Sequence, residues 1–337
     1  MIRPAEHWAA GDLKAYPRNK LHTHLLLEAA AARGLSVQEP GGLLRRFFDH
    51  SRSCYLTGRR FASVSMVASR IARNKIVTAE ILARRGIRTP GGRAFPADRY
   101  EEGEAFFRLL DAPAVVKPLA GAGGRGVHTN IQSLRDFKEA WAEVVRVDEG
   151  DVVIERFIAG QECRLFVVHD HVCAAALRHP ARVEGDGRNT IAGLVATKSA
   201  QRRAIPYVGE RPIRLTPHML RRLEQAGMSA ETLLPAGAIW QLHEISNISS
   251  GGESEDVTEQ LHPEFAAIAV SACAAIPGLG YAGVDILAEN IKESPRAQRW
   301  AVCELNADPE FALHHFPLRG AARDVAGHLI EAHLRED

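Results

Sequence analysis

The middle of the chain carries short apolar runs that indicate a β-sheet more than a bundle of helices. The run "DVVIERFI" (151–158) is followed by "CRLFVVH" (163–169) and "HVCAAAL" (171–177). Asp170 alone separates the last two runs, so they predict a hairpin of antiparallel strands. An antiparallel hairpin at this point limits the fold to architectures with at least one antiparallel sheet.

Helical and strand-like segments alternate irregularly on either side of this hairpin. The amphipathic segment "SLRDFKEAWAEVV" predicts a helix with Ser133 as its N-cap. Further helices are expected over residues 21–35, 72–85, 262–276 and 323–334, and further strands over 114–117, 282–288 and 300–305. Because the order lacks a steady β-α-β alternation, we expect α+β lobes. Residues 197–237, rich in Arg and Pro, have no clear pattern and are expected to include a loop.

Length and composition exclude several classes of protein. A chain of 337 residues exceeds one ordinary core, so two or three lobes are expected. A net charge of +1 predicts neither nucleic-acid nor anionic-membrane binding. The chain has no bilayer-length apolar stretch and no apolar segment near its start, so the expected location is cytoplasmic. Its five cysteines form no CxxC pair, which favours core packing over disulfides or zinc.

The glycine-rich segment 121–126 raises the first functional question. It lacks the Lys-Ser or Lys-Thr pair of a Walker loop and the acidic partner of a Rossmann fingerprint. By itself it is most simply a hairpin tip. Its neighbours also permit a phosphate-binding loop, because Lys117 ends the preceding strand and Arg125 lies within the loop.

Acidic residues on predicted strands suggest a second kind of chemistry. Asp285 lies on one apolar strand, while Glu304 and Asn306 lie two residues apart on another and share a face. Such oxygen donors suit Mg²⁺, although a polar sheet edge explains them equally simply. Glu155 and Glu162 flank a turn. The backbone of this turn can pair with the edge of an adenine base, and the Glu162 side chain can accept hydrogen bonds from ribose hydroxyls. The alternative is that both are solvent-facing strand charges.

Three longer motifs join these clusters. They are "GDGRNTI" (185–191), "NISSGGESEDVTEQLHP" (247–263), and a C-terminal "H…P…G…R-x-V" pattern (314–325). In this order, the series resembles the ATP-grasp superfamily over residues 72–334. It is most similar to the ATP-grasp portions of cyanophycin synthetases and bifunctional glutathione synthetases. The resemblance implies an α+β ATP-grasp fold: a pre-grasp domain over 1–70, then an ATP-grasp domain over 71–335 with parts 71–112, 113–200 and 201–335.

The same resemblance implies a role for each candidate residue, with ATP and Mg²⁺, or Mn²⁺ in its place, as cofactors. Phosphate contacts are expected from Lys75 and Lys117. The lid over the phosphates is expected to include Gly123, Gly124, Arg125 and Gly126. Adenine and ribose contacts are expected at Glu155 and Glu162. Metal ligands are expected at Asp285, Glu304 and Asn306. Catalytic contacts near the γ-phosphate and acyl group are expected at Arg164, Asn247 and Arg182.

The implied activity is an ADP-forming ligase that joins the carboxylate of a small amino acid or peptide to an amine through an acylphosphate. A small-molecule kinase and a non-catalytic nucleotide-binding module remain alternatives. The chain departs from the family pattern at His243, where relatives carry Arg, and at Glu310, where they carry Gly. It also lacks the second enzymatic half of either relative, so we expect a stand-alone enzyme. A homodimer, the commonest soluble assembly, is the expected state.

Overall fold

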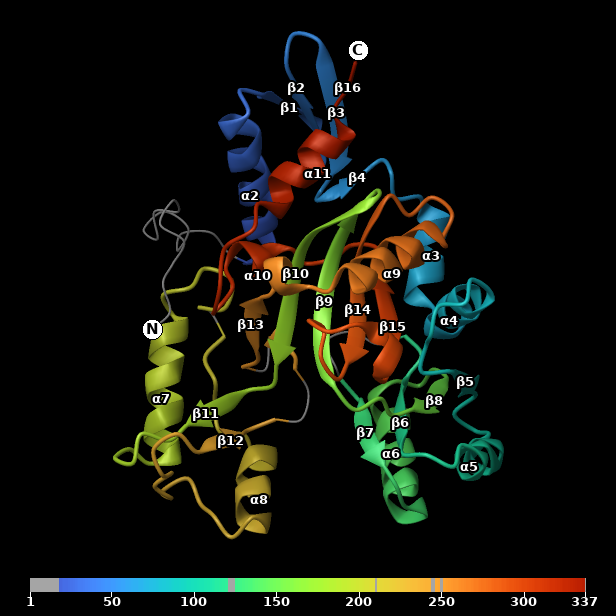
Figure 1. The fold of residues 1–337 in the computed structure, drawn as a ribbon, viewed down its shortest axis with the longest axis vertical. Coiled ribbons are helices and arrows are strands. Elements are labelled where there is room, and N and C mark those ends of the chain that lie inside the picture. Colours follow the sequence, from blue (N-terminus) through green and yellow to red (C-terminus); the bar gives the residue numbers. More distant parts are fainter. Residues whose placement is uncertain (1–17, 121–124, 210, 244–245, 249–250, 337) are drawn as a thin grey trace. The chain divides into compact units, whose positions relative to one another are not determined.

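The computed structural model describes residues 18–120, 125–209, 211–243, 246–248 and 251–336 (Figure 1). The chain divides into two compact units. The first contains residues 1–59, 176–258 and 310–337, and the second contains residues 60–175 and 259–309. Each unit is therefore assembled from segments that are distant in the sequence.

An antiparallel sheet forms the centre of the second unit. Its strands run in the order β10 (His171–His179), β9 (Gln161–Val168), β14 (Tyr281–Ala288) and β15 (Trp300–Asn306). The β9–β10 hairpin confirms the hairpin expected from the sequence. Helix α9 (Pro263–Ala274) packs on this sheet, and α3 (Met66–Arg73) and α4 (Lys75–Arg84) contact β15. The sheet interior is apolar, so the few charged side chains within it stand out.

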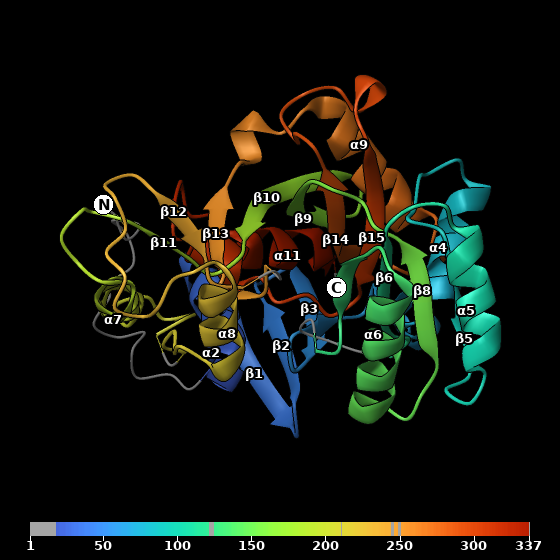
Figure 2. The same cartoon turned by 90° about the horizontal axis from the view of Figure 1, so that it is seen from below.

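A smaller sheet in the second unit carries the glycine-rich segment. Its strands are β5 (Gly92–Phe95), β8 (Val152–Arg156), β6 (Ala114–Pro118) and β7 (His128–Ile131). Helices α5 (Tyr100–Leu109) and α6 (Leu134–Val147) pack on it, as Figure 2 shows for α6 beside β6 and β8. Ser133 caps α6 by accepting from the Asp136 amide, as predicted. The short strand β4 (Arg60–Phe61) also belongs to this unit.

The first unit contains a sheet that the sequence analysis missed. Strands β1 (Ser36–Gly41), β2 (Leu44–Phe48) and β3 (Arg52–Thr57) form an antiparallel meander, and β16 (Arg335–Glu336) pairs with β3. Many of the residues in these strands are polar or exposed, which hides their period of two. The predicted helix over 21–35 is α2 (Arg18–Ala32), and the last predicted helix is α11 (Val325–His333).

The rest of the first unit includes residues 197–237, the segment that had no clear sequence pattern. This segment includes loops on both sides of a helix, as expected, and the helix is what the sequence did not reveal. Helix α8 (Pro217–Gln225) begins behind a Thr216 cap and buries Met219 and Leu223. The last residues of β10 pair with β13 within this unit. Its other elements are α7 (Ile191–Arg202), α8 (Pro217–Gln225), β11 (Arg182–Glu184), β12 (Ile239–Gln241), β13 (Glu253–Asp256) and α10 (Ala312–His315). Two 3₁₀ turns cover Thr258–Gln260 and Pro295–Ala297.

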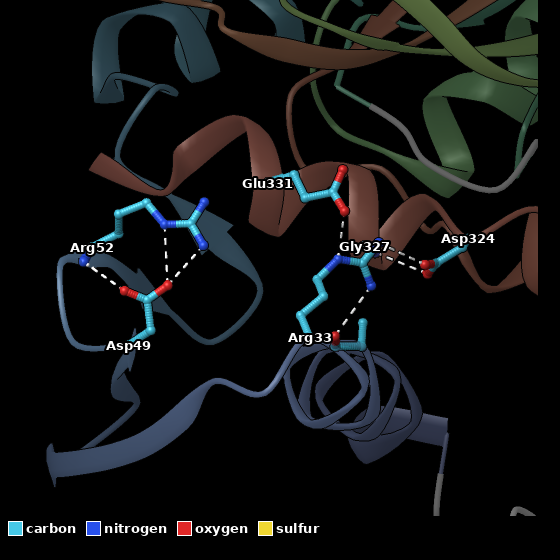
Figure 3. Close-up of polar contacts among 7 residues, drawn as sticks. Arg33, Asp49, Arg52, Asp324, Gly327 and Glu331 are labelled. Atoms are coloured by element: carbon cyan, nitrogen blue, oxygen red, sulfur yellow. Dashed lines mark hydrogen bonds and ion pairs between the residues drawn. The ribbon is translucent and has the colours of Figure 1, made fainter. Parts of the chain in front are cut away.

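One arginine joins the two ends of the chain within the first unit (Figure 3). Arg33, just beyond α2, donates to Asp324 Oδ2 at 3.0 Å and to Glu331 Oε1 at 2.8 Å. Asp324 also caps α11, because its Oδ1 accepts from the Gly327 amide at 2.9 Å. The same figure shows Asp49 and Arg52 closing the β2–β3 turn. A single carboxylate thus both starts α11 and fixes it to α2.

We predict that Asp324→Ala lowers the free energy of unfolding by about 1–2 kcal/mol, because the helix loses its cap and Arg33 loses a partner. Asp324→Asn should cost less, since an amide oxygen still caps the helix. Burial opposes ionisation, but the Gly327 amide and Arg33 hold the pKa of Asp324 below its ordinary value. The difference in the free energy of unfolding between wild type and Asp324→Asn should therefore be largest at neutral pH. It should shrink as the pH falls through the pKa of Asp324. Urea unfolding at several pH values measures it; equal losses for both variants would rule out the capping role.

Candidate functional site

The two predicted metal-binding carboxylates lie directly opposite each other in the second unit. Asp285 on β14 is the antiparallel partner of Glu304 on β15. The register then shifts, so that Ile286 pairs with Val302 and Cys303 is the extra residue on β15. Asp285 is 3% exposed. The two acidic residues of these consecutive strands are thus brought together, as the sequence analysis required.

Arg164 holds Asp285 in place from the other neighbouring strand. It lies opposite Asp285 in the β9–β14 register. Its Nε donates to Asp285 Oδ1 at 2.7 Å and its Nη2 to Oδ2 at 2.6 Å, and both side chains are buried. A bidentate pair of this kind is among the stronger polar contacts in proteins.

Asn306 completes this group. Its Nδ2 donates to Asp285 Oδ2 at 3.3 Å. With the amide turned over, the nitrogen donates to Glu304 Oε1 at 3.1 Å and the oxygen accepts from Arg164 Nη2 at 3.0 Å. The second orientation satisfies both ends of the amide and directs it toward complementary charges. In the second orientation Asn306 links Glu304 to Arg164, which also holds Asp285, so one network joins the two carboxylates.

Two lysines belong to the same charged region. Lys117 on β6 forms an ion pair with Glu155 on β8, and both side chains are largely buried. Burial opposes the charge, yet Glu155 raises the pKa of Lys117 above its ordinary value, with a smaller contribution from Glu304. Burial lowers the pKa of Lys75, and Glu304 partly offsets this effect. Lys75 Nζ also donates to the Leu119 carbonyl at 3.1 Å.

The donor set fits a magnesium ion that keeps water and shares phosphate oxygens. Asp285 and Glu304 supply carboxylate oxygens and Asn306 an amide oxygen, all hard donors. No group of three or more His, Cys, Asp or Glu side chains suited to a metal occurs among the described residues. Since only two of the three predicted ligands are acidic, the site would depend on additional oxygens from a phosphate. The metal roles of these residues stay predictions.

The remaining nucleotide-binding candidates of the second unit are described in part. Gly123 and Gly124 lie outside the described residues. Arg125 is exposed and donates to the Val147 carbonyl at 3.0 Å. Gly126 has a φ of 71°, a conformation that favours glycine.

Two positions mark the turn between β8 and β9. Glu162 is half-buried at the start of β9. At Gly160, an added Cβ would lie 2.5 Å from the Ala288 carbonyl oxygen, so the turn requires glycine. Glu155, predicted to contact adenine, here pairs with Lys117 through its side chain.

Arg182 and Asn247, predicted to be catalytic, belong to the first unit. Arg182 Nε lies 3.9 Å from Glu253 Oε2, and the Asn247 carbonyl accepts from the Gly252 amide at 3.0 Å. The catalytic roles of Arg182 and Asn247 stay predictions.

The first unit also contains both departures from the family pattern. The His243 ring lies 5.7 Å from that of His218. Glu310 is half-buried, and the Tyr207 hydroxyl donates to its Oε2 at 2.7 Å. Glu310 thus has a hydrogen-bond partner within the first unit. Tyr207 was missed because its segment has no readable pattern.

Comparison with known proteins identifies the domain that contains some of these residues. The model of the RimK-like ATP-grasp domain matches residues 72–201. The chain contains an ATP-grasp domain. This match confirms the resemblance inferred from the motifs, and the ATP-grasp region includes Lys75, Lys117 and Arg164.

Similar proteins extend the ATP-grasp likeness over most of the chain. The bifunctional glutathione biosynthesis protein GshAB of Mannheimia succiniciproducens is 30% identical over 92% of this chain and 42% of its own length. Cyanophycin synthetase of Trichormus variabilis is 34% identical over 77% of this chain and 29% of its own. The crystal structure of a bifunctional glutathione synthetase from Pasteurella multocida, 28% identical, matches with a TM-score of 0.69 over 92% of this chain and 43% of that one.

These matches support the ATP-grasp fold, while this chain spans less than half the length of each of these relatives. Within the described part of the chain, no helix has both the length and the apolar character needed to cross a membrane.

The buried Arg164–Asp285 pair leads to a stability prediction. Arg164→Met or Asp285→Asn should each lower the free energy of unfolding by about 3 kcal/mol, because either change leaves a buried charge uncompensated. Arg135→Gln breaks an exposed pair with Glu139 and should cost less than about 1 kcal/mol. Chemical unfolding of the three variants measures this, and a cost for the buried variants no larger than the control's would contradict it.

Proposed function

We propose that this protein is an ATP-dependent, ADP-forming carboxylate–amine ligase that uses Mg²⁺. The proposal rests mainly on one observation: Asp285, Glu304 and Asn306 lie on strands beside Arg164, which belongs to the matched ATP-grasp region. Lys75 and Lys117, which share the electrostatic environment of Glu304, supply positive charge in the same unit. Phosphoryl transfer needs such positioning and charge compensation more than it needs a covalent catalyst.

The residues divide the work in a simple way. Lys117, kept protonated by Glu155, and Lys75 would neutralise the phosphate oxygens of ATP. Asp285, Glu304 and Asn306 would hold Mg²⁺, which compensates negative charge on the phosphates when it is bound. Arg164 orients Asp285 and offers its guanidinium to charge that develops on the transferred group.

In the proposed reaction, a substrate carboxylate oxygen attacks the γ-phosphorus and ADP leaves. An amine then attacks the acyl carbon, phosphate leaves and an amide bond forms. Glycines 121–126 would cover the nucleotide and exclude water from the acylphosphate. The amine proton passes to solvent or to a base not assigned among these residues.

The relatives narrow the substrate class. Two of them are named for glutathione biosynthesis and for cyanophycin synthesis. We infer that this chain acts on a small amino acid or peptide carboxylate. A homodimer and a cytoplasmic location remain part of the proposal.

A kinase or a silent nucleotide-binding module remains the alternative, and one assay separates the three. The protein is incubated with ATP, Mg²⁺ and pools of amino acids and dipeptides, with and without hydroxylamine as an amine trap. A ligase releases ADP and phosphate and yields a hydroxamate. A kinase yields a phosphorylated product, and a module yields neither.

Glu304→Gln should reduce ADP release at least a hundredfold, because the oxygen set that would hold Mg²⁺ loses one of its two carboxylates. The fold should persist, since an amide fills the same volume. Glu289→Gln, on an exposed pair with Arg299, is the matched control and should retain the wild-type rate. Steady-state ADP release with melting curves measures both, and a near wild-type rate for Glu304→Gln would overturn the metal assignment.

Lys117→Met should weaken ATP binding by roughly ten- to a hundredfold, the usual value of a charge-assisted contact. It also leaves Glu155 buried without its cation, so the double variant Lys117→Met/Glu155→Gln serves as the control for stability. If the double variant regains stability but not affinity, the phosphate role is supported. Unchanged ATP affinity in Lys117→Met, measured by equilibrium titration, would count against it.

A further inference from the structure

A group of basic side chains in the first unit surrounds one buried carboxylate. Glu253, the first residue of β13, has a side chain that is 2% exposed. Lys198 of α7 contacts it directly. Arg319 Nη2 lies 3.5 Å and Arg182 Nε 3.9 Å from its Oε2. Three cations from separate segments therefore face a single carboxylate, which we call the Glu253 cluster.

A fourth cation lies deeper and strengthens this imbalance. Arg202 is fully buried and donates to the carbonyls of Ile248, Gly251 and Gly252 at 3.1, 3.2 and 2.8 Å. Burial lowers its pKa, and Glu253 partly offsets that effect. Arg202 thus fixes the backbone that leads directly into Glu253.

Among the described residues, the acids that follow Glu253 on β13 do not balance these charges, because each already has its own partner. Asp256 accepts a fork from Arg323, with contacts of 3.0 and 2.7 Å. Glu255 Oε2 lies 3.0 Å from His179 Nε2. Of the acids in the described ranges, Glu253 is therefore the one with which Lys198, Arg182 and Arg319 are paired.

Two of these cations remain accessible. The side chain of Arg182 is 22% exposed and that of Arg319 is 50% exposed. As far as the described residues show, neither guanidinium donates a hydrogen bond, and each lies beyond ordinary hydrogen-bond distance from Glu253. Guanidinium groups recognise planar oxyanions through paired N–H donors. The Glu253 cluster therefore has the chemistry of a half-open oxyanion site.

We propose that the Glu253 cluster binds a carboxylate of the amino acid or peptide substrate, one that is not activated by ATP. This deepens the proposed function and rests on it for the identity of the substrate. The loop that contains Asn247, predicted to contact the acyl group, joins the cluster through Gly252 and Arg202.

Direct binding tests the site without requiring catalysis. The full chain is titrated calorimetrically at low salt with glutarate, with its uncharged analogue glutaramide and with inorganic phosphate. Glutarate should bind, and Arg319→Gln should weaken that binding roughly tenfold, as expected for the loss of a charged donor. Arg135→Gln, which removes an equal charge from an exposed helix, should change nothing. Equal binding of glutarate and glutaramide, no effect of Arg319→Gln, or tighter binding of phosphate than of glutarate would each overturn the proposal.

Turnover provides the second test. For any substrate found in the ADP-release screen, the ratio of kcat/KM between the free acid and its carboxamide should fall about tenfold in Arg319→Gln. A purely structural Arg319 would lower both values equally and leave the ratio unchanged, which would refute the assignment. If the wild-type protein turns over no substrate from all of the pools, the ligase proposal is refuted. The calorimetric titration then decides by itself whether the Glu253 cluster binds an oxyanion.

Discussion

The buried fork between Arg164 and Asp285 is the interaction on which the candidate active site depends. It joins β9 to β14 through side chains as well as through the sheet, and it fixes the carboxylate that Asn306 contacts. An isolated carboxylate at this depth would be strongly destabilising. Arg164 therefore makes a buried anion tolerable, and in doing so it keeps an acidic side chain where a cation-dependent reaction needs it.

The lysines show the same principle with the charges reversed. Lys117 stays protonated in a buried position because Glu155 lies beside it, and Lys75 lies in the same field with Glu304 as its nearest acidic influence. Positive and negative groups thus stabilise each other in the second unit. A nucleotide with its metal would exchange these internal pairs for its own, which limits the electrostatic cost of binding.

Much of this arrangement was predictable from the sequence. The β9–β10 hairpin, the Ser133 cap, and the shared face of Glu304 and Asn306 all follow from local patterns that tertiary structure did not override. The pairing of Asp285 with Arg164 was not predictable, because it depends on the register of strands more than a hundred residues apart. The β1–β3 meander was missed since its residues lack regular alternation, and the Tyr207 contact to Glu310 lies in a segment without a readable pattern.

Charge in the first unit is organised differently, and this difference bears on substrate choice. Around Asp285, one arginine forms a direct fork with the carboxylate. Around Glu253, three cations face one carboxylate, and the side chains of Arg182 and Arg319 are 22% and 50% exposed. A folded chain gains little by retaining such a surplus, because like charges close together repel. An anionic ligand would reduce that repulsion, which is the physical basis of the proposal that the Glu253 cluster binds a substrate carboxylate.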